Sequence, residues 1–123
     1  MARSQKEILI VEDEPMVRMV AADALADCGI VAWEAGDAEE ALAVLDLHPA
    51  ISLLFTDVDM PGEMDGVALA RLVHKLRPDV ELVITSGATV IANDDLPDHG
   101  AFLGKPYQMD IMVQIVETKL RSA

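Results

Sequence analysis

Several kinds of residue are scarce in this sequence, and each scarcity excludes something. Cys28 is the only cysteine among 123 residues, so no internal disulfide and no cysteine-based metal framework can form. A lone thiol fits a reducing compartment, and we expect a cytoplasmic protein. No apolar run approaches the roughly 18 residues that a membrane-spanning helix needs. We therefore expect no association with a membrane.

Basic residues are also scarce. Nine lysines and arginines stand against 22 aspartates and glutamates, which gives a formal net charge of −13. Nucleic-acid binding requires a basic surface that neutralises phosphates, so we expect no direct contact with DNA or RNA. The length fits one domain with an ordinary core, which we place at residues 1–123.

Short apolar segments rich in branched residues recur along the chain, and each ends at an acidic residue, Gly or Ser. Such segments are typical of buried strands in parallel sheets. We predict five strands, with the sequences EILIV, IVAWEA, ISLLFTD, ELVITS and AFLG.

Helical patterns separate these strands. Apolar residues recur at helical spacing, and we expect them on one face of a helix: Val17, Val20, Ala21, Ala24, Leu25 and Cys28. Pro15 suits a first helical turn, and Asp37 and Asp65 suit N-caps. A helix within residues 88–100 would be short. The alternation predicts an α/β fold with a five-stranded parallel sheet, right-handed crossovers and helices on both faces.

Polar residues gather where the predicted strands end. In open sheets of this class, ligands bind outside the carboxyl ends of the strands. We therefore take as candidate site residues the polar side chains at those ends: Glu12, Asp13, Asp57, Asp59, Ser86 and Lys105.

The electrostatics of this edge point to a chemistry. If the first and third strands are neighbours, Glu12, Asp13 and Asp57 converge, and like charges ~4 Å apart repel by about 4 kcal/mol at a protein-like dielectric. Either one carboxyl keeps its proton or a hard cation binds, and Mg²⁺ suits a site of a few carboxylates. With Lys105 and the Ser86 hydroxyl available to an anion, the site suits phosphoryl transfer, with Asp57 as nucleophile.

Five motifs now stand in order at the strand ends: ED at Glu12 and Asp13, Asp57 followed by MPG, DG at 65–66, TSG at 85–87 and KP at 105–106. Over essentially the whole chain they resemble the receiver domain of two-component response regulators. The resemblance implies a doubly wound, flavodoxin-like sheet with strand order 2-1-3-4-5. It also implies a signalling protein whose only catalysis is phosphoryl transfer to itself and autodephosphorylation.

The resemblance assigns roles to the acidic residues. Asp57 would accept a phosphoryl group from a phosphohistidine, carried by a sensor histidine kinase or a histidine phosphotransfer protein. Asp13 and Asp57, with the backbone carbonyl of Asp59, would hold Mg²⁺, and Glu12 would act through a bound water.

The remaining roles also come from the resemblance. Ser86 would bond a phosphoryl oxygen, Lys105 would pair with the phosphoryl group, and the Lys105–Pro106 peptide would be cis. Phe102 occupies the position of the aromatic switch that moves with Ser86. The output face would be built by the fourth expected helix, the strand AFLG and the last helix, and a downstream protein would bind there.

Three features depart from the family pattern. The usual turn MPxMDG is one residue longer here, MPGEMDG, so the loop beside Asp57 is expected to be reshaped. Residues 88–100 leave little room for the fourth helix. The Asp59 side chain lies where the family tunes the lifetime of the phosphoryl group, and an acid there could either repel or orient the attacking water.

Other interpretations of these residues remain open. Alone, Asp57 would be a strand terminator and Phe102 a static core residue. The DVD sequence also resembles the D-x-D of haloacid-dehalogenase-type phosphatases, with Asp57 as nucleophile and Asp59 as general acid; here, however, the acidic pair precedes the nucleophile. A flavodoxin-like nucleotide or flavin binder would share the architecture, but VEDEP after the first strand would repel phosphate.

Overall fold

The structure is a computed structural model and describes residues 5–87 and 100–122. Strands and helices alternate along the described chain. In order they are β1 (Glu7–Val11), α1 (Pro15–Ala26), β2 (Val31–Ala35), α2 (Ala38–Leu47), β3 (Ile51–Asp57), α3 (Gly66–Leu76), β4 (Glu81–Ser86), β5 (Ala101–Gly104) and α4 (Met109–Ser122).

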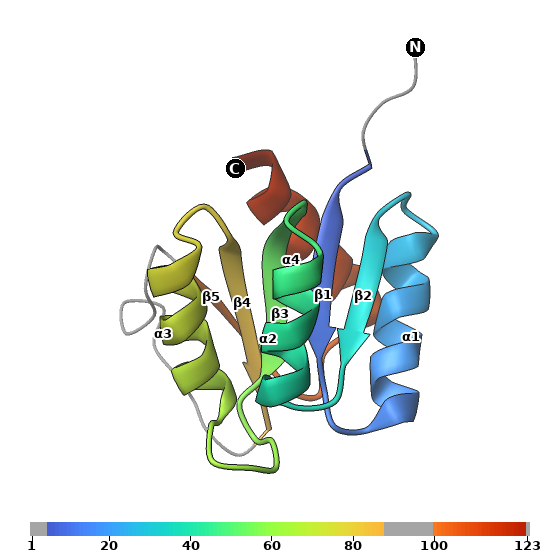
Figure 1. Ribbon diagram of the computed structural model, residues 1–123. Helices are drawn as coiled ribbons and strands as arrows, with labels where there is room; N and C mark the ends of the chain where they lie inside the picture. The colour runs from blue at the N-terminus through green and yellow to red at the C-terminus, as the bar shows by residue number, and fades with distance from the viewer. Residues whose placement is uncertain (1–4, 88–99, 123) are drawn as a thin grey trace.

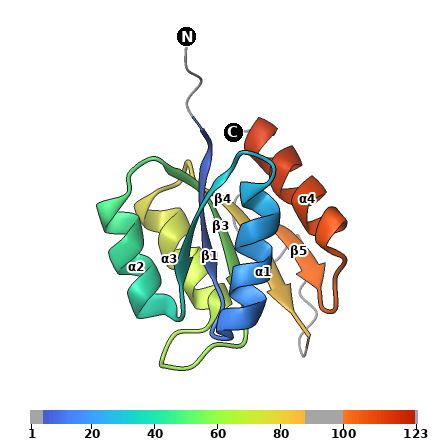
Figure 2. The same ribbon diagram turned by 90° about the vertical axis from the view of Figure 1, so that its right-hand side faces the viewer.

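The strands form one parallel sheet with the order β2-β1-β3-β4-β5. Helices α2 and α3 cover one face, and α1 and α4 cover the other (Figures 1 and 2). The predicted fold and strand order are therefore confirmed. The short helix expected within residues 88–100 falls almost entirely outside the described residues, so the last expected helix carries the label α4.

Two clusters of apolar side chains, one on each face of the sheet, make up the core. Successive residues of β1 alternate between them: Leu9 and Val11 pack with α2 and α3, whereas Ile8 and Ile10 pack with α1 and α4. Because neighbouring side chains of a strand point to opposite faces, a strand between two helical layers has to be apolar throughout. This explains the unbroken apolar runs in the sequence.

The expected start signals are found at three helices. Pro15 lies in the first turn of α1. The Asp37 carboxylate accepts a hydrogen bond from the Glu40 amide at 2.8 Å, and Asp65 accepts one from the Ala68 amide at 2.9 Å. These caps satisfy amides that have no partner within the helix, so the sequence positions the starts of α2 and α3.

The prediction for the buried face of α1 is wrong in part. Val17 and Val20 are 38% and 49% exposed, and Cys28 is also exposed. Ala21 and Leu25 are buried as expected, together with Ala22. Apolar periodicity alone does not separate the buried part of this face from the exposed part, because both parts are apolar. The result is an exposed apolar surface on α1.

Gly66 fixes how the loop after β3 returns to the sheet. Its amide donates to the Val58 carbonyl at 3.0 Å, and a Cβ at this position would overlap the backbone carbonyl of Asp57. Only glycine permits so close an approach. The DG motif therefore places the start of α3 directly against the end of β3.

None of the helices in the described part of the chain has the length and hydropathy to cross a membrane.

Candidate functional site

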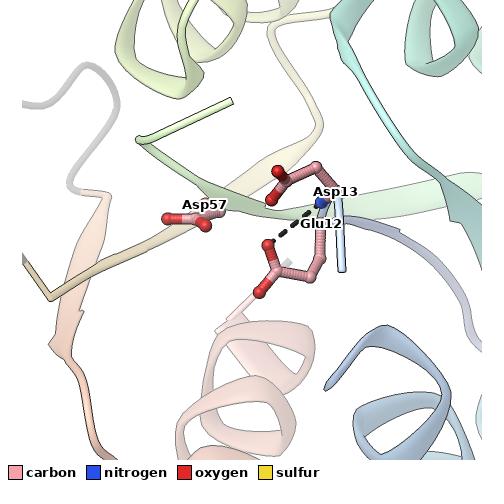
Figure 3. Close-up of side chains that lie close together, drawn as sticks. All are labelled: Glu12, Asp13 and Asp57. Atoms are coloured by element: carbon pink, nitrogen blue, oxygen red, sulfur yellow. Dashed lines mark hydrogen bonds between the residues drawn. The ribbon is translucent and has the colours of Figure 1, made fainter. Parts of the chain in front are cut away.

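Two buried acids lie side by side at the carboxyl edge of the sheet. Val11 and Thr56 are register partners in β1 and β3, so the next residues, Glu12 and Asp57, come together. Glu12 is 5% exposed and Asp57 is 4% exposed. Asp13 is exposed, and one carboxylate oxygen from each of the three acids lies within 4.8 Å of the others (Figure 3).

Lys105 joins the two buried acids. Its Nζ lies 3.0 Å from Glu12 Oε1 and 3.0 Å from Asp57 Oδ2. The backbone brings it there, because the Lys105 amide donates to the Ser86 carbonyl at 3.0 Å just beyond the end of β5. The Lys105–Pro106 peptide is cis, as the resemblance implies.

The charges at this edge are not balanced. The pKa of Glu12 is raised from 4.5 to about 7, mainly by burial and also by the hydrogen bond and charge of Asp57, while Lys105 acts in the opposite direction. Burial lowers the pKa of Lys105, but its hydrogen bonds and charge interactions with Glu12 and Asp57 outweigh burial, so its pKa lies above the ordinary value. Three carboxylates thus lie around one ammonium group, and a proton on Glu12 reduces the excess of negative charge.

The donor set fits a hard divalent cation. Its groups are carboxylate oxygens, which Mg²⁺ prefers, and Asp13 is open to water, which Mg²⁺ retains when it binds proteins. The Asp13 amide donates to Glu12 Oε2 at 3.0 Å, so the Glu12 carboxylate is held in place (Figure 3). Among the described residues, this is the cluster of acids that could hold a metal ion.

Asp59 and Ser86 form a second pair next to the acids. The Ser86 hydroxyl donates to Asp59 Oδ2 at 2.9 Å, and the Asp59 amide donates to Asp57 Oδ1 at 3.2 Å. The Asp59 side chain is therefore directed to Ser86, and it is not part of the three-carboxylate cluster. Its predicted metal contact, through the backbone carbonyl, stays a prediction.

Phe102 lies one strand further out, as the register partner of Ile84 between β5 and β4. It is partly buried and packs against the core cluster on the α2 and α3 face. Its predicted role as a switch stays a prediction.

Arg18 is a site neighbour that the sequence reasoning missed. From the fourth position of α1, its Nη1 donates to the backbone carbonyl of Glu12 at 2.9 Å. The acceptor is a main-chain atom, which leaves no signature in the side chains around it. Position alone, five residues after Asp13 on the following helix, could have suggested that the side chain reaches back.

The sequence as a whole matches a known family. A model of the response regulator receiver domain matches residues 8–117. The chain therefore belongs to the receiver domain family of two-component signalling, which confirms the resemblance. Neither the haloacid-dehalogenase-type phosphatase nor the flavodoxin-like binder is favoured.

Particular relatives agree with this assignment. The chain is 32% identical to the response regulator receiver protein CpdR of Brucella abortus, over 96% of this chain and 99% of that protein. It is 35% identical to the sensor kinase CckA of the same organism, over 92% of this chain but only 12% of CckA. Its fold matches a CheY-like receiver domain protein of Methanospirillum hungatei with a TM-score of 0.86 and 27% identity, over 97% of this chain and 96% of that one.

Proposed function

We propose that Asp57 accepts a phosphoryl group from the phosphohistidine of a sensor histidine kinase or a histidine phosphotransfer protein. The observation that carries this proposal is the position of Lys105, whose Nζ lies 3.0 Å from both buried carboxylates. A cation shared between Asp57 and Glu12 can neutralise the charge of an incoming phosphoryl group without leaving the pocket.

In the transfer, a carboxylate oxygen of Asp57 attacks phosphorus as the phosphorus–nitrogen bond breaks. The electron pair of that bond stays on the imidazole, which takes up a proton, and Asp57 becomes an aspartyl phosphate. The Asp59 amide holds one oxygen of the Asp57 carboxylate. Ser86 exchanges its bond to Asp59 for one to a phosphoryl oxygen. Water later cleaves the phosphorus–oxygen bond and restores Asp57, so the protein acts only on itself.

Asp13 and Asp57, the backbone carbonyl of Asp59, and Glu12 through a water would hold Mg²⁺. When bound, the ion would neutralise the carboxylates and the phosphoryl oxygens. The crowding of three carboxylates within 4.8 Å supports this part of the proposal.

The donor protein has an apolar surface available beside the acceptor. An apolar groove runs from Met16, Val17 and Val20 on α1 to Lys105 and Tyr107, and Met16 is 70% exposed. A helix that carries the phosphohistidine would cover this groove as it reaches Asp57. The likeness to part of a sensor kinase and to CpdR supports a place in a histidine-to-aspartate relay.

We further propose that this receiver domain acts in the cytoplasm and does not bind nucleic acid itself, which its net charge of −13 supports. The match covers 99% of the length of CpdR. Among the curated relatives CckA and NtrX, by contrast, the chain spans only 12% and 26% of the whole protein. A downstream target would bind the face that includes β5 and α4.

The test is incubation with acetyl phosphate and MgCl₂, followed by intact mass measurement. We expect one labile phosphoryl adduct on the wild-type protein and none on Asp57→Asn. Asp46→Asn, the same substitution at an exposed position of α2, is the matched control and should be labelled normally. Absence of an adduct on the wild type, or an adduct on Asp57→Asn, would contradict the proposal.

A further inference from the structure

Arg18 ties the loop after β1 to the neighbouring strand. Its Nη1 donates to the Glu12 carbonyl at 2.9 Å, and its Nε lies 3.1 Å from Glu34 Oε1 on β2. The Glu12 amide is bound to the same strand, because it donates to the Ala35 carbonyl at 3.0 Å. Both backbone groups of Glu12 are thus linked to β2: the amide directly, and the carbonyl through Arg18.

The bond from Arg18 also fixes the direction of the next amide. The Glu12 carbonyl and the Asp13 amide belong to one peptide unit, which is planar. When Arg18 holds the carbonyl on one side, the amide must point to the other side. There it donates to Glu12 Oε2 at 3.0 Å.

This amide in turn orients the Glu12 carboxylate. With Oε2 held by the Asp13 amide, Oε1 faces Lys105 Nζ at 3.0 Å, and Lys105 also contacts Asp57. A continuous set of bonds therefore leads from Glu34 through Arg18 and the 12–13 peptide to the buried carboxylates. Such outer contacts set the positions of metal ligands.

We propose that Arg18 is a positioning residue that sets the affinity of the acidic pocket for a divalent cation, by fixing the peptide between Glu12 and Asp13. This inference rests on the proposed function, since it concerns the same pocket. Arginine suits the task because its guanidinium donates in two directions at once, which a lysine ammonium on a flexible stem does less rigidly.

Simple electrostatics predicts the opposite sign. Arg18 is a positive charge next to the pocket, so its removal should strengthen the binding of a cation if charge alone matters. If Arg18 acts by positioning, its removal should weaken binding. The direction of the change therefore separates the two effects.

The test is titration of the full chain with MgCl₂ by isothermal calorimetry. We expect Arg18→Ala to weaken Mg²⁺ binding about five- to tenfold, within or just below the range seen for contacts behind metal ligands. Arg18→Lys should recover part of that loss. Arg71→Ala removes the same charge at an exposed position of α3 and should bind as the wild type does, or slightly tighter.

A second measurement covers the case in which a variant is merely destabilised. The ¹H–¹⁵N spectrum without metal reports on folding, and the Asp13 amide should shift in Arg18→Ala while amides of α3 stay in place. Binding by folded Arg18→Ala as tight as the wild type, or an unmoved Asp13 amide, would overturn the inference. If the wild type itself binds no Mg²⁺, the proposed metal site and the effect of Arg18 on affinity both fail. If the wild type binds Mg²⁺ and Arg18→Ala binds it equally well, only the inference about Arg18 fails.

Discussion

A cationic side chain lies at each end of β3, but the two side chains contact different kinds of acceptor. At the start of the strand, the Arg77 guanidinium donates to the backbone carbonyls of Ile51, Leu45 and Pro49. At the end of the strand, Lys105 contacts the carboxylates of Asp57 and Glu12.

Backbone carbonyls do not titrate, so the acceptors of Arg77 keep the same charge as the pH changes. Carboxylates bind protons, metal ions and phosphoryl groups, so the partners of Lys105 change with conditions. From this difference we infer that the contacts at the amino end of β3 stabilise the fold. The crowded carboxylates at the carboxyl end lower stability, but they can bind protons, metal ions and phosphoryl groups.

The largest effect should come from breaking the amino end. Arg77→Ala removes the donor to carbonyls at the end of α2 and the start of β3, and hydrogen bonds to charged groups contribute about 1.5–3 kcal/mol each. We expect the free energy of unfolding to fall by about 3 kcal/mol in urea denaturation. Phosphorylation of the folded fraction should be unchanged. Equal loss in the exposed control Arg71→Ala would show that net charge, and not these bonds, is responsible.

At the carboxyl end, stability should depend on pH through Glu12. Its pKa is raised to about 7 from 4.5, so the folded state keeps a proton that the unfolded chain releases. Stability is therefore fully present below about pH 4.5 and is lost as the pH rises to about 7. In EDTA, Glu12→Gln should become more stable than the wild type over this window, by about 2 kcal/mol at pH 8. Urea denaturation across the pH range measures the difference in the free energy of unfolding between Glu12→Gln and the wild type. A difference that does not change with pH would contradict the raised pKa of Glu12.

Lys105→Met should separate response from stability at the same end. Without the ammonium, the charge of the incoming phosphoryl group is less neutralised, and we expect adduct formation with acetyl phosphate to slow about tenfold, or ~1.4 kcal/mol. The free energy of unfolding should fall by less than in Arg77→Ala, since Lys105 is partly exposed. A variant that is labelled as fast as the wild type would refute this role.

The smallest effect concerns the bond between Ser86 and Asp59. Asp59→Ala removes the acceptor at 2.9 Å from the Ser86 hydroxyl, so the hydroxyl can turn to a phosphoryl oxygen without first breaking this bond. We expect adduct formation to accelerate about two- to threefold, in line with a hydrogen bond of modest net energy. Asp59→Asn keeps an acceptor and should change the rate less. Slower labelling in Asp59→Ala would assign the opposite role to this bond.

Much of the fold was predictable because its signals are local. The unbroken apolar runs indicate strands that are buried on both faces, as β1 and β3 are. Asp37 and Asp65 indicate where helices begin, and both carboxylates cap helices in the structure. The convergence of Glu12 with Asp57 follows from the adjacency of β1 and β3 in a sheet of this class.

The parts that were missed depend on side-chain direction. The Arg18 bond ends on a main-chain oxygen, and the Asp59 contact depends on the direction in which its side chain turns beyond the end of β3. On α1, Val17 and Ala21 are both apolar, and only the packing against the sheet decides which is buried. None of these is encoded in residue type alone.

The most direct test of the responsive carboxyl end is the number of protons released when Mg²⁺ binds. Calorimetric titration at pH 7 in two buffers of different ionisation enthalpy gives this number. With the pKa of Glu12 at about 7, we predict release of about half a proton per ion at pH 7 and almost none at pH 8.5, and none at either pH for Glu12→Gln. Binding without proton release at pH 7, or no binding at all, would contradict the pocket of crowded carboxylates that we describe.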